Sequence, residues 1–219
     1  MLFDLDGTLL DSVYQHVLAW HEALEAEHIE LSIWRIHRRI GMSGGLFVKA
    51  LGRELGTSIS QEQAERLQKA HADGVLKRLD QIRPLPGARE LLASLSALKV
   101  PWAIATSSSA KTAGPTTAML GLPAGTPIVT RDQVSFAKPN PDLFLAAAER
   151  LGADPRECFV IGDSVWDLLA ARRAGAPGIG LLSGGYGKEE LEEAGPYRVY
   201  DDPADLLAHL DELGIRGAG

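Results

Sequence analysis

Apolar residues recur at helical spacing through roughly the first third of the chain. In residues 12–28, where Ser12 can cap a helix, four apolar side chains fall on one face: Val13, Val17, Trp20 and Leu24. Residues 46–55 and 60–79 repeat this spacing, and the second of these stretches opens on a capping-box arrangement, Ser60-Gln61-Glu62-Gln63. The pattern therefore predicts that residues 12–83 are all helical.

The pattern changes at Arg83-Pro84-Leu85-Pro86-Gly87, where two prolines and a glycine end the helical run. Beyond it, short apolar runs typical of buried strands alternate with helical stretches. The predicted strands are residues 100–105, 127–129, 158–161 and 178–182, with an edge strand at 197–200. The predicted helices are 88–98, a helix ending at 120 that Gly114 and Pro115 delay or kink, 141–151, a helix ending at 174, and 203–213. Strands and helices that alternate on short links form a parallel sheet covered on both faces.

The first residues must join the same sheet, because a strand ending at Leu5 has no other partner. Only three residues precede Asp4, whereas a strand usually has about five or six, so we expect this strand to begin upstream of Met1. The predicted fold class is α/β, with a Rossmann-like parallel-sheet core (residues 1–11 and 84–219) and an inserted all-helical cap domain (residues 12–83). We expect the cap above the carboxyl ends of the strands, where open α/β sheets bind their ligands.

Composition narrows the classes of partner. A hydrophobic content of 45% in 219 residues supports a packed core, and the net charge of −7 argues against nucleic acid or an anionic membrane as the main partner. The single cysteine, Cys158, lies in an apolar run and cannot form an internal disulfide. Without a signal sequence or a long apolar segment, the protein is expected to be cytoplasmic, as a monomer or a small homo-oligomer.

Two carboxylates stand together at the start of the chain. Asp4 and Asp6 directly follow an apolar segment and precede Gly7-Thr8. Side chains alternate along a strand, so both acids point to the same side, and a bound cation would offset their repulsion. The alternative is a plain turn at the end of a strand. A calcium EF-hand loop is excluded, because its glycine and glutamate positions hold Leu9 and Gln15.

Four places that end a predicted strand, or lie in the loop after one, carry the groups that a phosphate and a cation need. They are Asp4 with Asp6, Thr106 with Ser107, Lys138, and Asp163 with Asp167. Magnesium takes hard oxygen ligands, which Asp4, Asp163 and the backbone carbonyl of Asp6 could supply. Each group also has a structural alternative. Thr106 and Ser107 would cap the next helix, Lys138 would be a solvated loop residue, and Asp167 would be a surface acid on a first helical turn.

In this order and spacing, the four segments resemble the four motifs of the haloacid dehalogenase superfamily. Within it, the chain is similar over nearly its whole length to the phosphoglycolate phosphatase and β-phosphoglucomutase group, whose helical cap is inserted after the first motif. The resemblance implies a Mg²⁺-dependent enzyme with Asp4 as nucleophile and Asp6 as general acid and base. It further implies phosphate binding by Thr106, Ser107 and Lys138, magnesium binding by Asp4, Asp6 and Asp163, and a supporting role for Asp167.

The presence of Asp6 favours phosphoryl transfer, since a dehalogenase needs no acid to protonate a leaving oxygen. His16 and Trp20 resemble cap positions that face substrate in the mutase, although the helical spacing of Trp20 favours the cap core. Gly44 stands where the mutase has a phosphate-binding arginine, and Gly162 before Asp163 is more like the phosphatases. Three arginines could meet an anionic substrate or form a solvated basic face: Arg35, Arg38 and Arg39.

We therefore predict a magnesium-dependent phosphatase that acts on a small phosphorylated metabolite, with His16 facing the substrate. Three alternatives stay open. They are a phosphosugar mutase, a phosphoacceptor signalling domain and a binding protein without catalytic activity.

Overall fold

The computed structural model describes residues 1–56 and 58–216, which include a six-stranded parallel sheet with the strand order β5-β4-β1-β6-β7-β8. The strands are β1 (Leu2–Phe3), β4 (Ala103–Ala105), β5 (Ile128–Val129), β6 (Val160–Gly162), β7 (Gly178–Leu181) and β8 (Arg198–Tyr200). The first strand pairs with β4 on one side and β6 on the other. The predicted Rossmann-like core is thus confirmed, with β1 at its centre and β8 at an edge.

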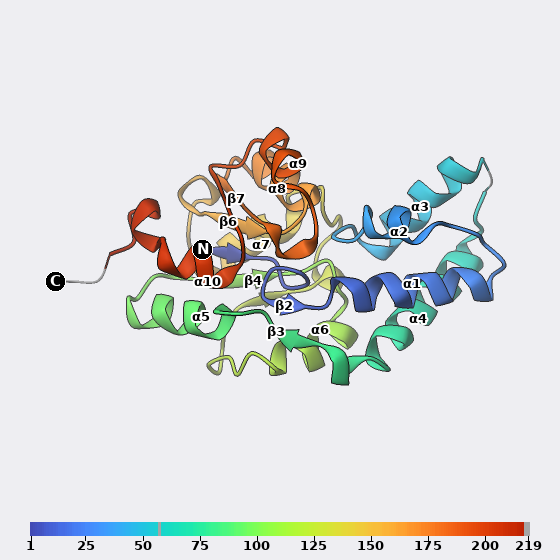
Figure 1. Ribbon diagram of the computed structural model, residues 1–219, viewed down its shortest axis with the longest axis horizontal. Helices are drawn as coiled ribbons and strands as arrows, with labels where there is room; N and C mark the ends of the chain where they lie inside the picture. The colour runs from blue at the N-terminus through green and yellow to red at the C-terminus, as the bar shows by residue number, and fades with distance from the viewer. Residues whose placement is uncertain (57, 217–219) are drawn as a thin grey trace.

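Helices cover both faces of this sheet (Figure 1). One set comprises α5 (Ala88–Ala97), α6 (Ala110–Ala118) and α10 (Pro203–Ala208), and the other comprises α7 (Asp142–Leu151), α8 (Val165–Ala174) and α9 (Lys188–Glu193). Neighbouring residues of β1 serve the two faces, because Phe3 belongs to one apolar cluster with Leu91 and Leu2 to another with Phe144. This alternation follows from the period of two along a strand.

A second body of helices extends from one end of the sheet, at the right of Figure 1. It contains α1 (Val13–Ala26), α2 (Ile33–His37), α3 (Gly44–Leu55) and α4 (Gln61–Leu76). The four apolar residues predicted on one face of the first helix are all buried here, in a cluster that also includes Phe47 and Leu67. The predicted helical cap is therefore present with an apolar core of its own.

A short ribbon joins the two bodies. Strand β2 (Leu10–Asp11) pairs antiparallel with β3 (Arg83–Pro84), so the chain leaves the core and returns to it through adjacent segments. Two residues per strand are too few to leave a periodic pattern, and the sequence did not predict this pair. The domain division at residues 11 and 84 stays a prediction, and we propose this ribbon as its boundary.

Several local expectations were wrong. The Ser12 hydroxyl makes no cap bond to α1, and it donates instead to Asp6 Oδ1. Helix α6 begins at Ala110 with Pro115 inside it, so Gly114 and Pro115 do not delay its start, while the alternative of a kink stays a prediction. The closing helix ends at Ala208 and is followed by a separate 3₁₀ turn. Helix α9 was not predicted, because Leu191 is its single apolar residue and gives no periodicity.

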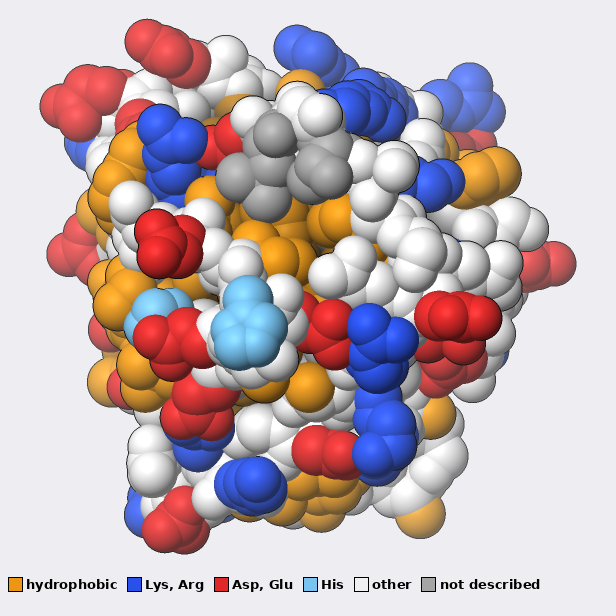
Figure 2. All heavy atoms as spheres, turned by 90° about the vertical axis from the view of Figure 1, so that its right-hand side faces the viewer, with side chains coloured by type: hydrophobic (Ala, Val, Ile, Leu, Met, Phe, Trp, Pro, Cys, Tyr) orange, Lys and Arg blue, Asp and Glu red, His pale blue; other side chains and the backbone are white. Residues whose placement is uncertain are grey.

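Five 3₁₀ turns complete the described structure: Leu79–Gln81, Arg131–Gln133, Pro155–Glu157, Leu182–Gly184 and Leu210–Leu213. Within the described residues, no helix has both the length and the apolar character required to cross a bilayer. Figure 2 looks onto the outer end of the cap, where basic and acidic side chains are interspersed. This face carries no field of a single sign.

Candidate active site

The site forms where three neighbouring strands end. Asp4 follows β1, Thr106 follows β4 and Asp163 follows β6, and these strands are adjacent in the sheet. The backbone N–H of Asp4 donates to the carbonyl of Ile161 over 2.8 Å, which fixes the height of β1 against β6. The carboxyl ends of parallel strands lie at one edge of a sheet, so residues about 160 positions apart in sequence converge.

Lys138 is completely buried between two carboxylates. Its Nζ contacts Asp4 Oδ1 and lies 2.8 Å from Asp167 Oδ1. Burial opposes a charge on the lysine, but the two carboxylates outweigh it and raise the pKa of Lys138 above its ordinary value. The Phe144 ring lies 4.9 Å from the same nitrogen. The alternative of a solvated loop lysine is therefore wrong, and the group is a fixed positive charge beside Asp4.

Three carboxylates gather around this lysine. Oxygens of Asp4, Asp163 and Asp167 all lie within 4.8 Å of one another, and each side chain is buried. Burial, together with the charges of Asp167 and Asp6, raises the pKa of Asp4 to about 7, although Lys138 pulls it down. Burial and neighbouring acids likewise raise the pKa of Asp163 well above its ordinary value. Negative charge on this cluster is unfavourable unless a cation offsets it.

Neighbouring groups fix two of the three acids. Thr8 Oγ1 donates to Asp163 Oδ1 over 2.7 Å. A Cβ atom added at Gly184 would lie 1.9 Å from Asp163 Oδ2, so only glycine allows the 182–184 turn to approach this carboxylate. Ser164 donates to Asp167 Oδ2 through its hydroxyl, 2.5 Å, and its backbone N–H, 3.2 Å. Asp167 has no exposed surface, so the surface-acid alternative is wrong.

Asp6 does not share this cluster, because its carboxylate makes contacts of its own at the edge of the cap. Oδ1 accepts from Ser12 over 2.8 Å and lies 3.2 Å from His16 Nε2, while Oδ2 accepts from Ser108 over 2.8 Å and from Thr106 over 3.4 Å. Burial alone would raise the pKa of Asp6, but His16 and the hydroxyl donors outweigh it and lower that pKa below its ordinary range. Ser108 was not among the site residues predicted from the sequence.

Thr106 and Ser107 line the cavity at the end of β4, and neither caps the next helix. The N-cap of α6 is Ser109, which makes no side-chain cap bond. The Thr106 hydroxyl accepts from the Ser108 N–H over 3.0 Å. The Ser107 hydroxyl donates to the Gly41 carbonyl of the cap over 2.8 Å. The capping alternative is therefore wrong, and Ser107 bridges core and cap.

The cap contributes a stack of rings. His16 Nδ1 lies 3.1 Å from His71 Nε2, and the His71 ring stacks on Trp20 at 4.2 Å between centroids. Trp20 stacks in turn on Phe47 at 4.2 Å. Burial and the charge of His16 lower the pKa of His71 well below its ordinary value. Trp20 is thus a cap-core residue, as its spacing predicted, and it also lines the cavity.

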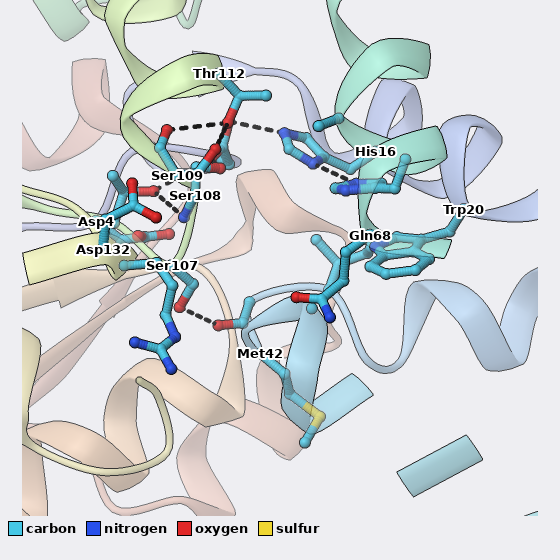
Figure 3. Close-up of a pocket in the computed structure, with 18 residues that line it drawn as sticks. Asp4, His16, Trp20, Met42, Gln68, Ser107, Ser108, Ser109, Thr112 and Asp132 are labelled. Atoms are coloured by element: carbon cyan, nitrogen blue, oxygen red, sulfur yellow. Dashed lines mark hydrogen bonds and ion pairs between the residues drawn. The ribbon is translucent and has the colours of Figure 1, made fainter. Parts of the chain in front are cut away.

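These groups enclose a cavity of about 150 Å³ between core and cap (Figure 3). Asp4, Asp6, Thr106 and Ser107 line it from the core, and His16 faces it from α1. His71 and Gln68 also line it, and the sequence did not single them out, because a lone polar residue on a helix carries no signal of what it faces. Arg35, Arg38 and Arg39 are not among its lining residues. They pair with Glu54 and Glu190 instead.

Comparison with known proteins gives a consistent result. Residues 1–175 match the family model described as haloacid dehalogenase-like hydrolase. The chain is 33% identical over 176 residues to hexitol phosphatase A of Escherichia coli (strain K12), covering 80% of this chain and 78% of that protein. It is 32% identical over 213 residues to a phosphoglycolate phosphatase of Caulobacter vibrioides, covering 94% and 85%. A hydrolase crystal structure from Pseudomonas syringae superimposes with a TM-score of 0.95 at 59% identity, with 97% of each chain covered.

Proposed function

Since the chain belongs to the haloacid dehalogenase-like hydrolases, in their phosphoglycolate phosphatase and β-phosphoglucomutase-like group, and is a phosphatase, we propose the chemistry of its reaction. It hydrolyses a small phosphorylated metabolite with magnesium, through an aspartyl-phosphate on Asp4. The observation that carries this proposal is the buried ion pair between Lys138 and Asp4, next to two further acids. A cavity of about 150 Å³ suits a small substrate, since pockets for drug-sized ligands span roughly 300 to 1,000 Å³.

Asp4 is the nucleophile in this proposal. A carboxylate that attacks phosphorus replaces one difficult hydrolysis with two easier displacements. Lys138 holds the carboxylate in place and offsets the negative charge that builds up as two anions approach. Because Lys138 is fully buried and paired on two sides, it loses little further freedom when the substrate binds.

The donor set fits magnesium. Three carboxylates whose oxygens lie within 4.8 Å of one another supply the hard oxygen ligands that this ion prefers. Asp4 and Asp163 would hold it, together with the backbone carbonyl of Asp6, and Asp167 would orient Lys138 and complete the negative charge. When bound, the ion offsets the charge of the phosphoryl group. The pKa values of Asp4 and Asp163 are raised because their ionised forms are unfavourable in this cluster, and a bound cation would stabilise those ionised forms.

Asp6 acts as the general acid and base, and the substrate must prepare it for this task. Its pKa is low because Ser12, His16 and Ser108 hold the ionised form. A phosphate dianion that enters the cavity brings negative charge close to Asp6, which raises the pKa of the carboxyl. His16 Nε2 is the nearest ring nitrogen from which a proton can pass to Asp6. Thr106 and Ser107 face the phosphate through hydroxyl and backbone N–H groups.

A phosphosugar mutase is the second candidate function. The absence of a charged side chain at Gly44 argues against it. A mutase must hold a second phosphate in the cap, and Gly44 offers no charge where the resemblance would place an arginine. The cap arginines do not supply this charge either, because they line a different hollow with Trp34 and Trp166: Arg35, Arg38 and Arg39. A signalling domain is a weaker candidate, because the chain has a helical cap over the site.

Hydrolysis of p-nitrophenyl phosphate with magnesium tests the proposal. We expect multiple turnovers that stop in EDTA and resume when magnesium is restored. A single stoichiometric phosphorylation without turnover would support the signalling domain instead. Conversion of β-glucose 1-phosphate to the 6-phosphate, primed by a bisphosphate, would support the mutase. A screen of phosphorylated metabolites then ranks the substrates. A cytoplasmic location and a monomeric or small homo-oligomeric state stay predictions.

A further inference from the structure

We propose that the cavity selects phosphate monoesters with an uncharged leaving group, and that it discriminates against a leaving group carrying a carboxylate or a second phosphate. The inference rests on the proposed function, because it concerns the part of the substrate that departs when Asp4 is phosphorylated. It follows from the charges that line the cavity and from how each of them is already paired.

The wall that the cap contributes has no lysine or arginine among its lining residues. Its polar groups are the imidazoles of His16 and His71 and the amide of Gln68, and Trp20 and Met42 supply apolar surface. Figure 3 shows Gln68 extending from the cap side into the space that faces Ser107 and Ser108. Imidazole and amide groups donate to and accept from hydroxyls. They therefore suit a hydroxylated leaving group better than an anionic one.

The positive charges near this wall are already paired. The Nε2 atom of His16 lies 3.2 Å from Asp6 Oδ1, so the carboxylate of Asp6 offsets a positive charge on the imidazole. The three cap arginines that the sequence offered as anion ligands do not line the cavity, and they form ion pairs with Glu54 of the cap and Glu190 of the core. A carboxylate on the leaving group therefore meets no arginine or lysine among the cap residues that line the cavity.

Among the residues that the structure describes, Arg131 is the one arginine or lysine that lines the cavity, and it comes from the core. Its guanidinium donates to the carbonyl of Val134 over 2.7 Å and to that of Ser135 over 3.3 Å, so its own loop holds the charged group in place. The next residue, Asp132, lines the same cavity, as do Asp4 and Asp6. Lys138 and His16 offset Asp4 and Asp6, but Asp132 places a negative charge next to Arg131 in the chain, and this charge opposes the binding of a second anion there.

Position 44 of the cap carries a glycine in a tight place. A Cβ atom added at Gly44 would lie 3.1 Å from Gln68 Cγ and 3.3 Å from Trp20 Cζ2. A side chain at position 44 would therefore require both neighbours to shift by a few tenths of an ångström. Gln68 is exposed and also lines the cavity, so a charge placed at this position stays in contact with solvent.

Matched pairs of esters test the inference. In each pair the size is similar and only the charge of the leaving group differs: 2-hydroxyethyl phosphate against phosphoglycolate, and glycerol 3-phosphate against 3-phosphoglycerate. We expect kcat/KM to be at least tenfold higher for the uncharged member of both pairs. Equal values, or a preference for the carboxylated member, would overturn the inference while turnover of p-nitrophenyl phosphate upholds the proposed function. Failure to hydrolyse any ester, p-nitrophenyl phosphate included, would contradict both the inference and the proposed function.

A charge added at the rim gives an independent test. Gln68→Lys should raise kcat/KM for the carboxylated ester relative to its uncharged partner at least fivefold. Gln68→Met removes the amide and adds no charge, so it should raise this ratio clearly less than Gln68→Lys does, and an equal rise in both variants would contradict the inference. Thermal unfolding of both variants checks that the cap is intact. A ratio that Gln68→Lys does not move in a folded protein would contradict the inference.

Discussion

The two walls of the cavity differ in how their polar groups are held. On the core side, Asp4 lines the cavity beside the buried Lys138, Asp163 and Asp167, and the lysine offsets part of the charge of the acids. On the cap side the polar groups are uncharged or offset by a neighbour, and Gln68 is exposed. Fixed charges stabilise a developing charge without reorganisation at the moment of reaction. Uncharged groups on a separate helical body can change without disturbing those charges.

Because the two walls differ in this way, substitutions on the two walls should have different effects. A change on the core side should abolish turnover or unfold the protein, because it leaves a buried charge without its partner. A change on the cap side should alter which ester is preferred. Asp6 connects the walls, since it follows β1 yet lies against His16 of α1.

The largest effect is expected from removing the nucleophile. Asp4→Asn should lower kcat for p-nitrophenyl phosphate by roughly four orders of magnitude or more, because the amide cannot form the aspartyl-phosphate. The fold should persist, since Lys138 keeps its ion pair with Asp167. Steady-state kinetics measures the loss, and circular dichroism checks the fold. Wild-type rates in this variant would remove the proposed mechanism altogether.

The next effect concerns the cation of the core wall. Lys138→Met should lower the free energy of unfolding by about 3 to 5 kcal/mol, the usual cost when one partner of a buried ion pair is removed. Lys188→Met is the matched control, because Lys188 is an exposed lysine 3.9 Å from Glu192. Its loss should cost at most about 1 kcal/mol. Urea denaturation compares the two, and equal losses would mean that Lys138 and its acids do not act as a buried unit.

Asp6 tests the connection between the walls. Asp6→Asn preserves the shape of the side chain but cannot exchange a proton, so kcat should fall by about 10² to 10⁴. For p-nitrophenyl phosphate the fall should be smaller than for an alkyl ester, because p-nitrophenolate leaves without protonation. Kinetics on the two esters measures this difference. An equal fall on both would contradict the acid role of Asp6 and leave it a positioning one.

The sequence predicted the core wall better than the cap wall, and the reason is geometric. Strand ends in a parallel sheet meet at one edge, so locating Asp4, Thr106 and Asp163 after strands was enough to predict that they converge. Lys138 followed from the same rule and the resemblance. His71 was out of reach, because its neighbour His16 lies 55 residues away and their contact depends on how α1 packs against α4.

Hydroxyls were the other weakness of the sequence-based prediction. The position of Ser12 before a helix predicts a cap, yet its hydroxyl donates to Asp6. Thr8, Ser108 and Ser164 likewise donate to the site acids. Hydroxyls near helix starts and turns usually satisfy the local backbone, so their choice of a distant carboxylate is visible only in three dimensions. The residues that carry charge could be predicted, and those that orient them could not.

The smallest effect is a pH dependence that originates in the core wall. Burial raises the pKa of Asp4 to about 7, whereas its unfolded value is near 3.8. A carboxyl whose pKa is raised by folding contributes most stability below its unfolded pKa and loses it as the pH rises through the folded one. In EDTA, the free energy of unfolding of the wild type should therefore fall, relative to Asp4→Asn, by about 2 kcal/mol between pH 5 and pH 7.

Magnesium should reverse this loss, because it binds the ionised carboxylates. The rise in melting temperature on adding magnesium should thus be larger at pH 8 than at pH 5. Asp6 does not change the stability between pH 5 and pH 8. Its pKa is lowered in the folded protein, so its effect on the free energy of unfolding is confined to pH values below about 4. Differential scanning calorimetry of the wild type and Asp4→Asn, with magnesium and with EDTA, measures both the loss of stability with pH and the rise in melting temperature caused by magnesium. A magnesium shift equal at the two pH values would mean that the three acids are already ionised without the metal, and that Lys138 alone balances the core wall.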